Sequence, residues 1–290
     1  MNVGDDTLPS RSRQAEVTLP KDVPNAWGAS SWNGKNGAAV SWLKSKSGQR
    51  RYFASRVFRD RAGTKPLTEG VPSVDVDANL REYLEGRKPN ERYASFDYCF
   101  NYFQSFRESR DVSALVSPVN IQISCLQLGF YLASWGMFRG SAELLQKSAR
   151  SLIHVLEVVA HTETSLWELD AHCYTESNIN RLMELASTIR QAQPSMSDTL
   201  VTKIMLGVFG NVPAFDANFK RGFGVATFGP KALRKVGGFF QAHAQAINAY
   251  CVPTLDFISG EPTQRNYPRA KVIDMAFFIE GLPSAEPVAS

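Results

Sequence analysis

Apolar and aromatic residues recur at helical spacing through almost all of the chain that follows Asn90. In SFDYCFNYFQSFRE (95–108), Phe96, Phe100 and Phe103 lie three or four residues apart, so they share one face of a helix. Prolines at 118, 194, 213, 230 and 253 separate such segments, and a proline ends or kinks a helix. The pattern predicts a mainly α fold in which several helices each bury one face.

The same spacing and the breakers between the segments predict the other helices. They are expected at about 77–87, 117–137, 141–161, 176–192, 198–209, 231–250 and 267–279. Polar residues that can cap a helix stand at several of the predicted starts. We expect Asp77 or Asn79, then Ser141, then Asp198 or Thr199 to cap their helices.

The first quarter of the chain differs from the rest. Residues 1–25 are polar and punctuated by prolines, which is typical of a loosely ordered segment. In residues 26–70, two short runs rich in aromatic and β-branched residues flank the turn-like KSKSGQR. They predict a small β-hairpin with strands near 37–44 and 51–59. Residues 71–290 are then expected to form one α-helical domain.

Composition excludes several classes of protein. With 43% hydrophobic and 21% charged residues, the chain resembles an ordinary globular protein, and its longest apolar runs are too short for a membrane span. Four scattered cysteines without a CxxC pair, and an N-terminus unlike a secretory signal, predict reduced thiols in a cytoplasmic protein. The sequence has no P-loop, no GxGxxG after a strand, no GxSxG and no HExxH.

The positive charge is concentrated in the predicted hairpin. Residues 1–70 carry 12 Lys and Arg against 6 Asp and Glu, whereas residues 71–290 carry 20 against 22. Basic residues that hold phosphates, interleaved with aromatic residues that stack on bases, are typical of nucleic-acid binding. A basic edge strand that prevents aggregation is the alternative. The candidate nucleic-acid-binding residues are Lys44, Lys46, Arg50, Arg51, Arg56 and Arg59.

A lysine and an aspartate frame the segment DTLVTKIMLGVFGNVPAFDANF (198–219). Lys203 lies on the predicted helix, and Asp216 follows the Gly-Asn-Val-Pro turn thirteen residues later. A lysine among apolar residues can lose its proton and act as a nucleophile, with an aspartate as its base. We name both as candidate catalytic residues. The alternative is structural: Lys203 extends from the core to water, and Asp216 caps the next helix.

This arrangement of lysine helix, Val-Pro turn and aspartate resembles the helix-hairpin-helix DNA glycosylases. In that family the lysine attacks the sugar C1′ and the aspartate supports the developing charge, and Lys203 and Asp216 are the matching positions. The interval between the two is shorter here, two residues instead of one separate Pro213 from the aspartate, and the glycine-rich hairpin before the lysine is missing. The resemblance covers about twenty residues.

Four blocks, at 93–103, 124–141, 198–219 and 267–281, resemble a family of uncharacterised, mostly bacterial proteins. From the first block to the last, they span about two thirds of the chain. The resemblance implies a shared α-helical fold without an agreed activity.

Three further groups of charged or polar residues have a predicted role. His154, Glu157 and His161 share one face of a predicted helix, as metal ligands in helical bundles do, so a divalent metal is an alternative to having no cofactor. Arg139, between Gly136 and Gly140, is a candidate to bind a phosphate or carboxylate. Lys271 and Asp274 are most simply a pair that stabilises its helix.

The leading functional hypothesis is therefore a cytoplasmic, nucleic-acid-associated protein in which Lys203 and Asp216 act on a base or sugar. The first alternative is a non-catalytic interaction subunit that binds a protein partner in a larger assembly. The second alternative is a metal-dependent helical enzyme built on His154, Glu157 and His161.

Overall fold

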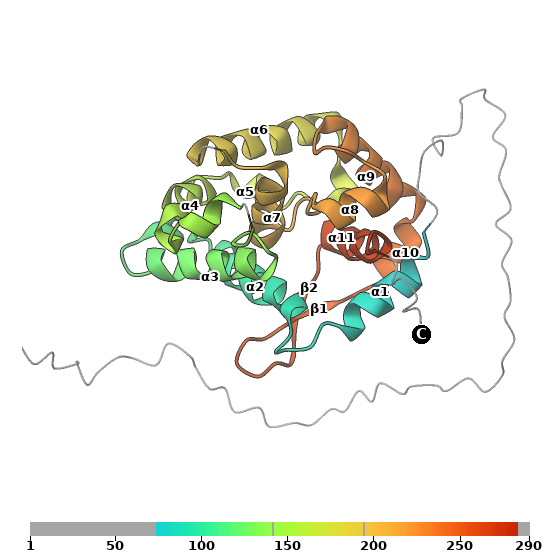
Figure 1. Cartoon of the computed structure of the whole chain (residues 1–290), viewed down its shortest axis with the longest axis horizontal. Coiled ribbons are helices and arrows are strands. Elements are labelled where there is room, and N and C mark those ends of the chain that lie inside the picture. The colour runs from blue at the N-terminus through green and yellow to red at the C-terminus, as the bar shows by residue number, and fades with distance from the viewer. Residues whose placement is uncertain (1–73, 141, 194, 284–290) are drawn as a thin grey trace, which may run out of the picture. The chain divides into compact units, whose positions relative to one another are not determined.

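The computed structural model describes residues 74–283, except 141 and 194, as a set of packed helices with one small sheet (Figure 1). The mainly α prediction is confirmed. The predicted N-terminal hairpin lies outside the described residues. The α-helices are α1 (Val76–Glu85), α2 (Ser95–Glu108), α3 (Ile121–Ser134), α4 (Ile153–Ala160), α5 (Thr164–Trp167), α6 (Glu176–Ala192), α7 (Asp198–Phe209), α8 (Ala217–Phe223), α9 (Pro230–Ala242), α10 (Ala244–Ala249) and α11 (Arg269–Glu280).

Five short 3-10 helices connect these elements. They are η1 (Arg92–Ala94), η2 (Val112–Val116), η3 (Glu143–Gln146), η4 (Ala149–Leu152) and η5 (Ala171–Cys173).

Two helices, α7 and α11, form the centre of the domain. Every residue from Leu200 to Phe209 in α7 is buried, and so is every residue from Ala270 to Ile279 in α11. A helix without a polar face has to be covered all round. The helices α2, α3 and α6 pack against α7, whereas α1, α8, α9 and α10 pack against α11 (Figure 1).

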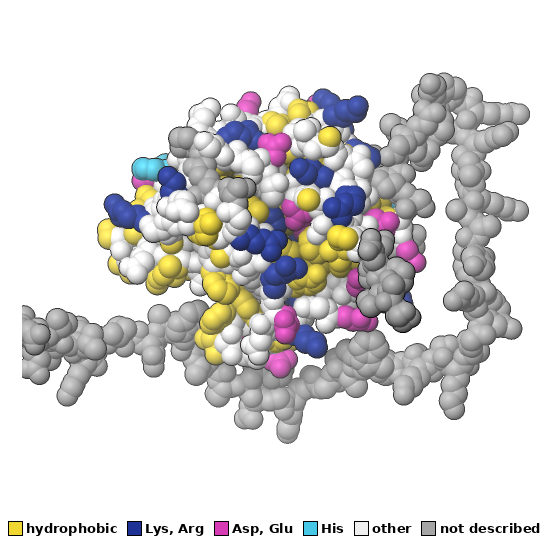
Figure 2. Space-filling model, viewed as in Figure 1, with side chains coloured by type: hydrophobic (Ala, Val, Ile, Leu, Met, Phe, Trp, Pro, Cys, Tyr) yellow, Lys and Arg dark blue, Asp and Glu magenta, His cyan; other side chains and the backbone are white. Residues whose placement is uncertain are grey.

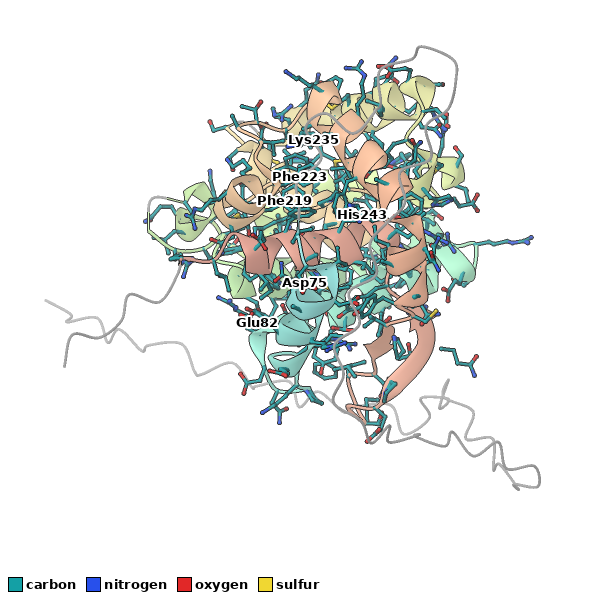
Figure 3. The ribbon with its side chains drawn as sticks, turned by 90° about the vertical axis from the view of Figure 1, so that its right-hand side faces the viewer. Asp75, Glu82, Phe219, Phe223, Lys235 and His243 are labelled. Atoms are coloured by element: carbon teal, nitrogen blue, oxygen red, sulfur yellow. The ribbon has the colours of Figure 1, made fainter. Side chains whose placement is uncertain are left out.

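The packing of α8 on α11 depends on glycine. A Cβ on Gly222 would lie 2.4 Å from the carbonyl oxygen of Phe277, closer than real contacts allow. The absence of a side chain lets the two backbones approach, and Phe219 and Phe223 of α8 then pack their rings against Phe277 (Figure 3). This close contact fixes the start of α8, where Asp216 stands, relative to α11.

The small sheet was not predicted from the sequence. Strands β1 (Pro253–Leu255) and β2 (Pro262–Asn266) pair antiparallel. Tertiary contacts from α2 hold this hairpin, since Asp97 accepts hydrogen bonds from the backbone amide of Leu255 at 3.0 Å and from the Tyr267 hydroxyl at 2.7 Å. Strands this short carry little local signal, so their pairing depends on the helix beside them.

Some helix boundaries differ from the prediction. The predicted helix 141–161 is interrupted, since two 3-10 helices precede α4, and its predicted cap, Ser141, lies outside the described residues. The predicted helix 231–250 is divided at His243 into α9 and α10. At two other starts the cap is an earlier residue, Asp75 for α1 and Ser197 for α7. Each side chain accepts a hydrogen bond from a first-turn amide, which satisfies a donor left free by the helix.

One side of α3 is apolar and exposed. Ile123, Leu126 and Phe130 of α3, together with Val119 just before the helix, follow helical spacing on this side and are 49% to 81% accessible. Among the described residues, which are 74–283 without 141 and 194, no helix has the length and apolar character needed to cross a membrane.

Candidate functional site

Helix α7, which carries Lys203, ends at Gly210 in a turn that directs the following segment back along the side of α7. Gly210 follows α7 with a φ of 69°, a left-handed conformation that favours glycine, and its amide bonds to the carbonyl groups of Met205 and Leu206. A Cβ at this position would also lie 2.5 Å from Pro268 and 2.8 Å from Phe100. The buried turn that follows, Asn211–Pro213, therefore leaves α7 in one fixed direction.

Two threonines of α7 hold the returning segment. The Thr202 hydroxyl accepts a hydrogen bond from the Phe215 amide at 2.9 Å, and the Thr199 hydroxyl donates one to the Phe215 carbonyl oxygen at 3.0 Å. From the other side, Asp274 of α11 accepts a hydrogen bond from the Ala214 amide at 2.9 Å. These bonds place Asp216 beside the helix turn that carries Lys203.

The structure brings together the two candidate catalytic residues. The Nζ atom of Lys203 lies 3.1 Å from Oδ2 of Asp216, and their side chains are 3% and 16% exposed. The second carboxylate oxygen, Oδ1, accepts a hydrogen bond from the Phe219 amide at 3.0 Å, so Asp216 is the N-cap of α8. The structural alternative is thus correct for the aspartate, whereas Lys203 stays buried and does not extend to water.

A second buried ion pair stands beside the first. The Nζ atom of Lys271 lies 2.9 Å from Oδ2 of Asp274 and 3.0 Å from the Tyr83 hydroxyl. Lys271, Asp274, Lys203 and Asp216 all line one cavity of about 10 Å³. A cavity of this size holds about one water molecule.

Trp135, the residue that ends α3, forms one wall of this cavity. The Nζ atoms of Lys203 and Lys271 lie 5.0 and 5.5 Å from the centre of its ring, and the guanidinium of Arg92 lies 5.3 Å from it. Cations at these distances are attracted to the face of an aromatic ring. Tyr131, another wall, packs directly on Gly207 of α7, where any side chain would clash with it.

Burial affects the two lysines differently. It lowers the pKa of Lys203 below the ordinary lysine value, and this effect outweighs the attraction of Asp216, which raises the pKa. Burial also acts to lower the pKa of Lys271, but Asp274 and Tyr83 together outweigh it, so that pKa is raised. Burial raises the pKa of Tyr83 to about 12. Lys271 is therefore a firmly held cation, and Lys203 is the lysine that gives up its proton more readily.

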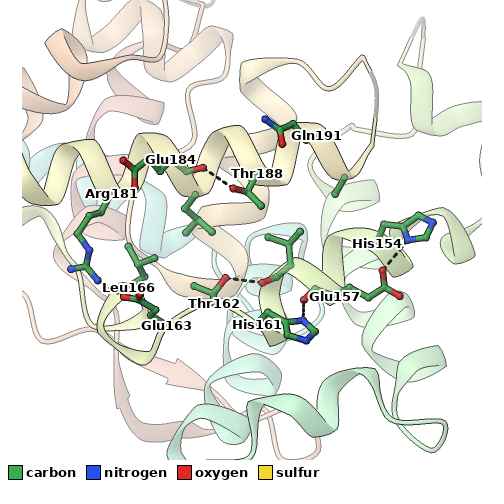
Figure 4. Close-up of a pocket in the computed structure, with 13 residues that line it drawn as sticks. His154, Glu157, His161, Thr162, Glu163, Leu166, Arg181, Glu184, Thr188 and Gln191 are labelled. Atoms are coloured by element: carbon green, nitrogen blue, oxygen red, sulfur yellow. Dashed lines mark hydrogen bonds and ion pairs between the residues drawn. The ribbon is translucent and has the colours of Figure 1, made fainter.

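The predicted metal ligands lie together in another place. His154, Glu157 and His161 line a groove of about 720 Å³ between α4 and α6 (Figure 4). The imidazole of His154 lies 2.9 Å from the Glu157 carboxylate, whereas Nδ1 of His161 donates to the Glu157 backbone oxygen at 2.7 Å. In the described part of the chain, no three His, Cys, Asp or Glu side chains are grouped closely enough to hold a metal ion.

The predicted nucleic-acid-binding residues are placed only in part. Lys44, Lys46, Arg50, Arg51, Arg56 and Arg59 lie outside the described residues. Arg139 is exposed, and its guanidinium lies against Gly136, the residue after Trp135. Gly136 has a φ of 80°, so a side chain there would be strained as well as blocked by Arg139.

The sequence argument missed Trp135 as a participant, and it named Lys271 and Asp274 only as a pair that stabilises its helix, a pair that the structure contains. For the last two, the usable signal is the helix around them, since VIDMAFFI (272–279) has no polar face and belongs in a core. A lysine and an aspartate in such a helix are buried with it and require partners. Trp135 had no comparable signal, because its neighbours across the cavity come from α7 and α11.

No protein-family model, no curated protein and no solved structure matches this chain, so the two resemblances drawn from the sequence stay predictions.

Proposed function

We propose that this protein acts on damaged nucleic acid and that Lys203 is its amine nucleophile, with Asp216 as the proton acceptor. The observation that carries the proposal is the buried Lys203–Asp216 contact of 3.1 Å, made by residues thirteen positions apart. A lysine whose pKa is lowered by burial supplies more of the neutral amine that attacks a carbonyl carbon. The carboxylate beside it is in position to take the proton.

The reaction class follows from a buried amine with a carboxylate 3.1 Å from it. At an abasic site the sugar C1′ is an aldehyde, and the Lys203 nitrogen would bond to it. The carbonyl oxygen would leave as water with the two hydrogens of the neutral amine, and an imine would remain. The Trp135 wall has to move for a sugar to enter, and Gly136 beside it, at a φ of 80°, offers the hinge.

Charge near the site supports a nucleic-acid substrate. From residue 217 to residue 255 the sequence carries five basic residues and no acidic one. This stretch begins directly after Asp216 and includes α8 and α9. Figure 2 shows Lys and Arg side chains gathered on the face of the molecule where Figure 1 shows α7, α8 and α11. Basic residues grouped in this way attract phosphates. The five are Lys220, Arg221, Lys231, Arg234 and Lys235.

Borohydride trapping tests the proposal. The full chain is incubated with a duplex that carries one abasic site, and sodium borohydride reduces any imine to a stable secondary amine. We expect a covalent complex with the wild type, none with Lys203→Ala, and an adduct on the peptide that contains Lys203 by mass spectrometry. Lys147→Ala, a change to an exposed lysine between η3 and η4, is the matched control and should trap normally. Equal trapping by Lys203→Ala, or no trapping by any of the proteins, would reject this function.

A second candidate is an interaction subunit without catalysis. The exposed apolar side of α3 favours it, because Val119 is 81% and Phe130 is 71% accessible. The partner would be another protein with a complementary apolar surface. Phe130→Glu should then abolish co-purification of that partner and leave the thermal stability unchanged, whereas retention of the partner would reject this surface as the interface.

A further inference from the structure

The two lysines that line the cavity donate different numbers of side-chain hydrogen bonds. Lys271 donates to both Asp274 and the Tyr83 hydroxyl, at 2.9 and 3.0 Å. Within the described residues, Lys203 donates to Asp216 alone, at 3.1 Å. An ammonium group has three hydrogens to donate, so the charged form of Lys203 is the less well satisfied of the two.

We propose that Lys271 is a positioning residue: it holds Asp274 in a separate ion pair and thereby leaves Lys203 with a single carboxylate, which favours the neutral amine. The inference rests on the proposed function, in which Lys203 has to lose its proton before it reacts. Lys271 itself is 1% exposed and stays charged. It has no direct contact with a substrate in this role.

The carboxylate oxygens show why the separation matters. Asp274 uses Oδ1 for the Ala214 amide and Oδ2 for Lys271. Asp216 uses Oδ1 for the Phe219 amide and Oδ2 for Lys203. If Lys271 lost its charge, Oδ2 of Asp274 would be a buried, unpaired acceptor in the cavity that Lys203 also lines. Lys203 would then be the remaining cationic side chain among the residues that line this cavity.

The groups that face Lys203 come from four elements. Asp216 stands at the start of α8, Tyr131 on α3, and Trp135 at the end of α3. Lys271 and Asp274 come from α11, and Tyr83 of α1 acts through its hydrogen bond to Lys271. Asp274 raises the pKa of Lys203 and Lys271 lowers it, so the two influences oppose each other while both residues are present.

Loss of the Lys271 charge would act on the Lys203 ammonium group in two ways. Removing this cation ends its repulsion of the Lys203 ammonium and frees the Asp274 carboxylate to attract it. Both changes favour the charged form of Lys203, so its pKa should rise. An opposite charge a few ångströms away typically moves a pKa by about 1 or more.

The test measures the pKa of Lys203 directly, by NMR titration of the full-length protein with its lysine side chains labelled with ¹³C, and Lys203→Arg identifies the signal. We expect Lys271→Met to raise this pKa by about 1. The double variant Lys271→Met with Asp274→Asn should return the pKa close to the wild-type value, because it removes both opposing charges. Lys235→Met, a change to a half-buried lysine of α9, is the control and should leave it unchanged.

An unchanged Lys203 pKa in Lys271→Met would overturn the inference, and so would a double variant that keeps the raised value. If Lys271→Met does not fold, the double variant still does, since it leaves no buried unpaired charge. In that case Asp274→Asn alone, which removes the attraction of Asp274 and leaves the repulsion of Lys271, should lower the pKa of Lys203. No fall in that variant would equally overturn the inference.

The titration needs no substrate, so its failure is distinct from the failure of the proposed function. If the pKa rises as expected and no imine is ever trapped, the positioning role stands and the proposed reaction is wrong. If both hold, the trapping rate of Lys271→Met at neutral pH should fall about tenfold, because a pKa higher by 1 leaves about one tenth of the neutral amine.

Discussion

Asp216 holds Lys203 with one carboxylate oxygen and the first turn of α8 with the other. The contacts are 3.1 Å to the lysine Nζ and 3.0 Å to the Phe219 amide. The bond to the helix therefore fixes the orientation of the Asp216 carboxylate before any substrate arrives. In that orientation its other oxygen, Oδ2, points toward Lys203. The acid has both a structural role and the geometry of a proton acceptor.

This double role predicts that the two partners differ in their effect on stability. Asp216→Ala removes a helix cap and leaves a buried ammonium, so we expect a loss of about 3 kcal/mol or more in the free energy of unfolding. Lys203→Met keeps the cap and fills the same volume, and the carboxylate keeps its amide partner. The expected loss is about 1 kcal/mol. Urea unfolding of both variants checks the order, which a larger loss for Lys203→Met would contradict.

The hydroxyl of Thr202 is expected to be needed to keep Asp216 in place. Thr202→Val leaves the buried Phe215 amide without its acceptor, at a cost of about 1–3 kcal/mol. The matched control is Thr188→Val, on the exposed side of α6, whose hydroxyl bonds only to the Glu184 carbonyl oxygen. It should change the stability by less than about 0.5 kcal/mol. Equal unfolding curves for the two variants would show that Thr202 does not hold the segment.

A pair of glycine substitutions tests the close packing of α8 on α11. Gly222→Ala places a methyl group 2.4 Å from the Phe277 carbonyl oxygen, which forces the helices apart, so we expect a loss of about 2 kcal/mol or more. Gly238 of α9 has no atom within 4 Å of its Cβ position. Gly238→Ala should therefore stabilise the protein by about 0.5–1 kcal/mol, as alanine favours helix. Thermal unfolding of the two variants measures whether each change raises or lowers the stability. If Gly222→Ala left the stability unchanged, the close packing of α8 on α11 would be contradicted.

The pH dependence of stability should include a contribution from Asp170. This carboxylate accepts the amides of Arg269 and Ala270, at 2.8 and 2.7 Å, where α11 begins. Burial acts to raise its pKa, but the His172 imidazole, 3.8 Å away, and the hydrogen bonds from these amides outweigh it, so the pKa is lowered from the ordinary value of 3.8. A lowered pKa stabilises the fold above 3.8, and this stabilisation is lost as the pH falls through the folded value.

Asp170→Asn should therefore be less stable than the wild type at neutral pH, by about 1–3 kcal/mol, since the buried amides lose a charged acceptor. The difference should shrink below pH 3.8, where the wild-type carboxylate takes up its proton. Thermal melts from pH 2 to 7 measure this difference. A gap that stays constant over the whole range would show that the charge of Asp170 has no part in stability.

Much of the site could be read from the order of residues. The run DTLVTKIMLGVF predicted a buried helix, Gly210 and Pro213 predicted its end, and Asp216 could be expected to cap the helix after it. These features depend on neighbours within a few positions, where periodicity, capping and φ preferences decide the structure. Local sequence was less informative for 141–161, because the same pattern allows one helix or several short ones.

The sequence by itself determined that the chain is mainly helical and that Lys203 and Asp216 stand on either side of one turn. Only the tertiary structure decided that they meet, because the 3.1 Å contact depends on Thr199, Thr202 and Asp274, which hold the returning segment from two helices. It also placed Lys271, 68 residues after Lys203, beside the same indole ring. Burial of charge is a property of the packed core, and no local pattern carries it.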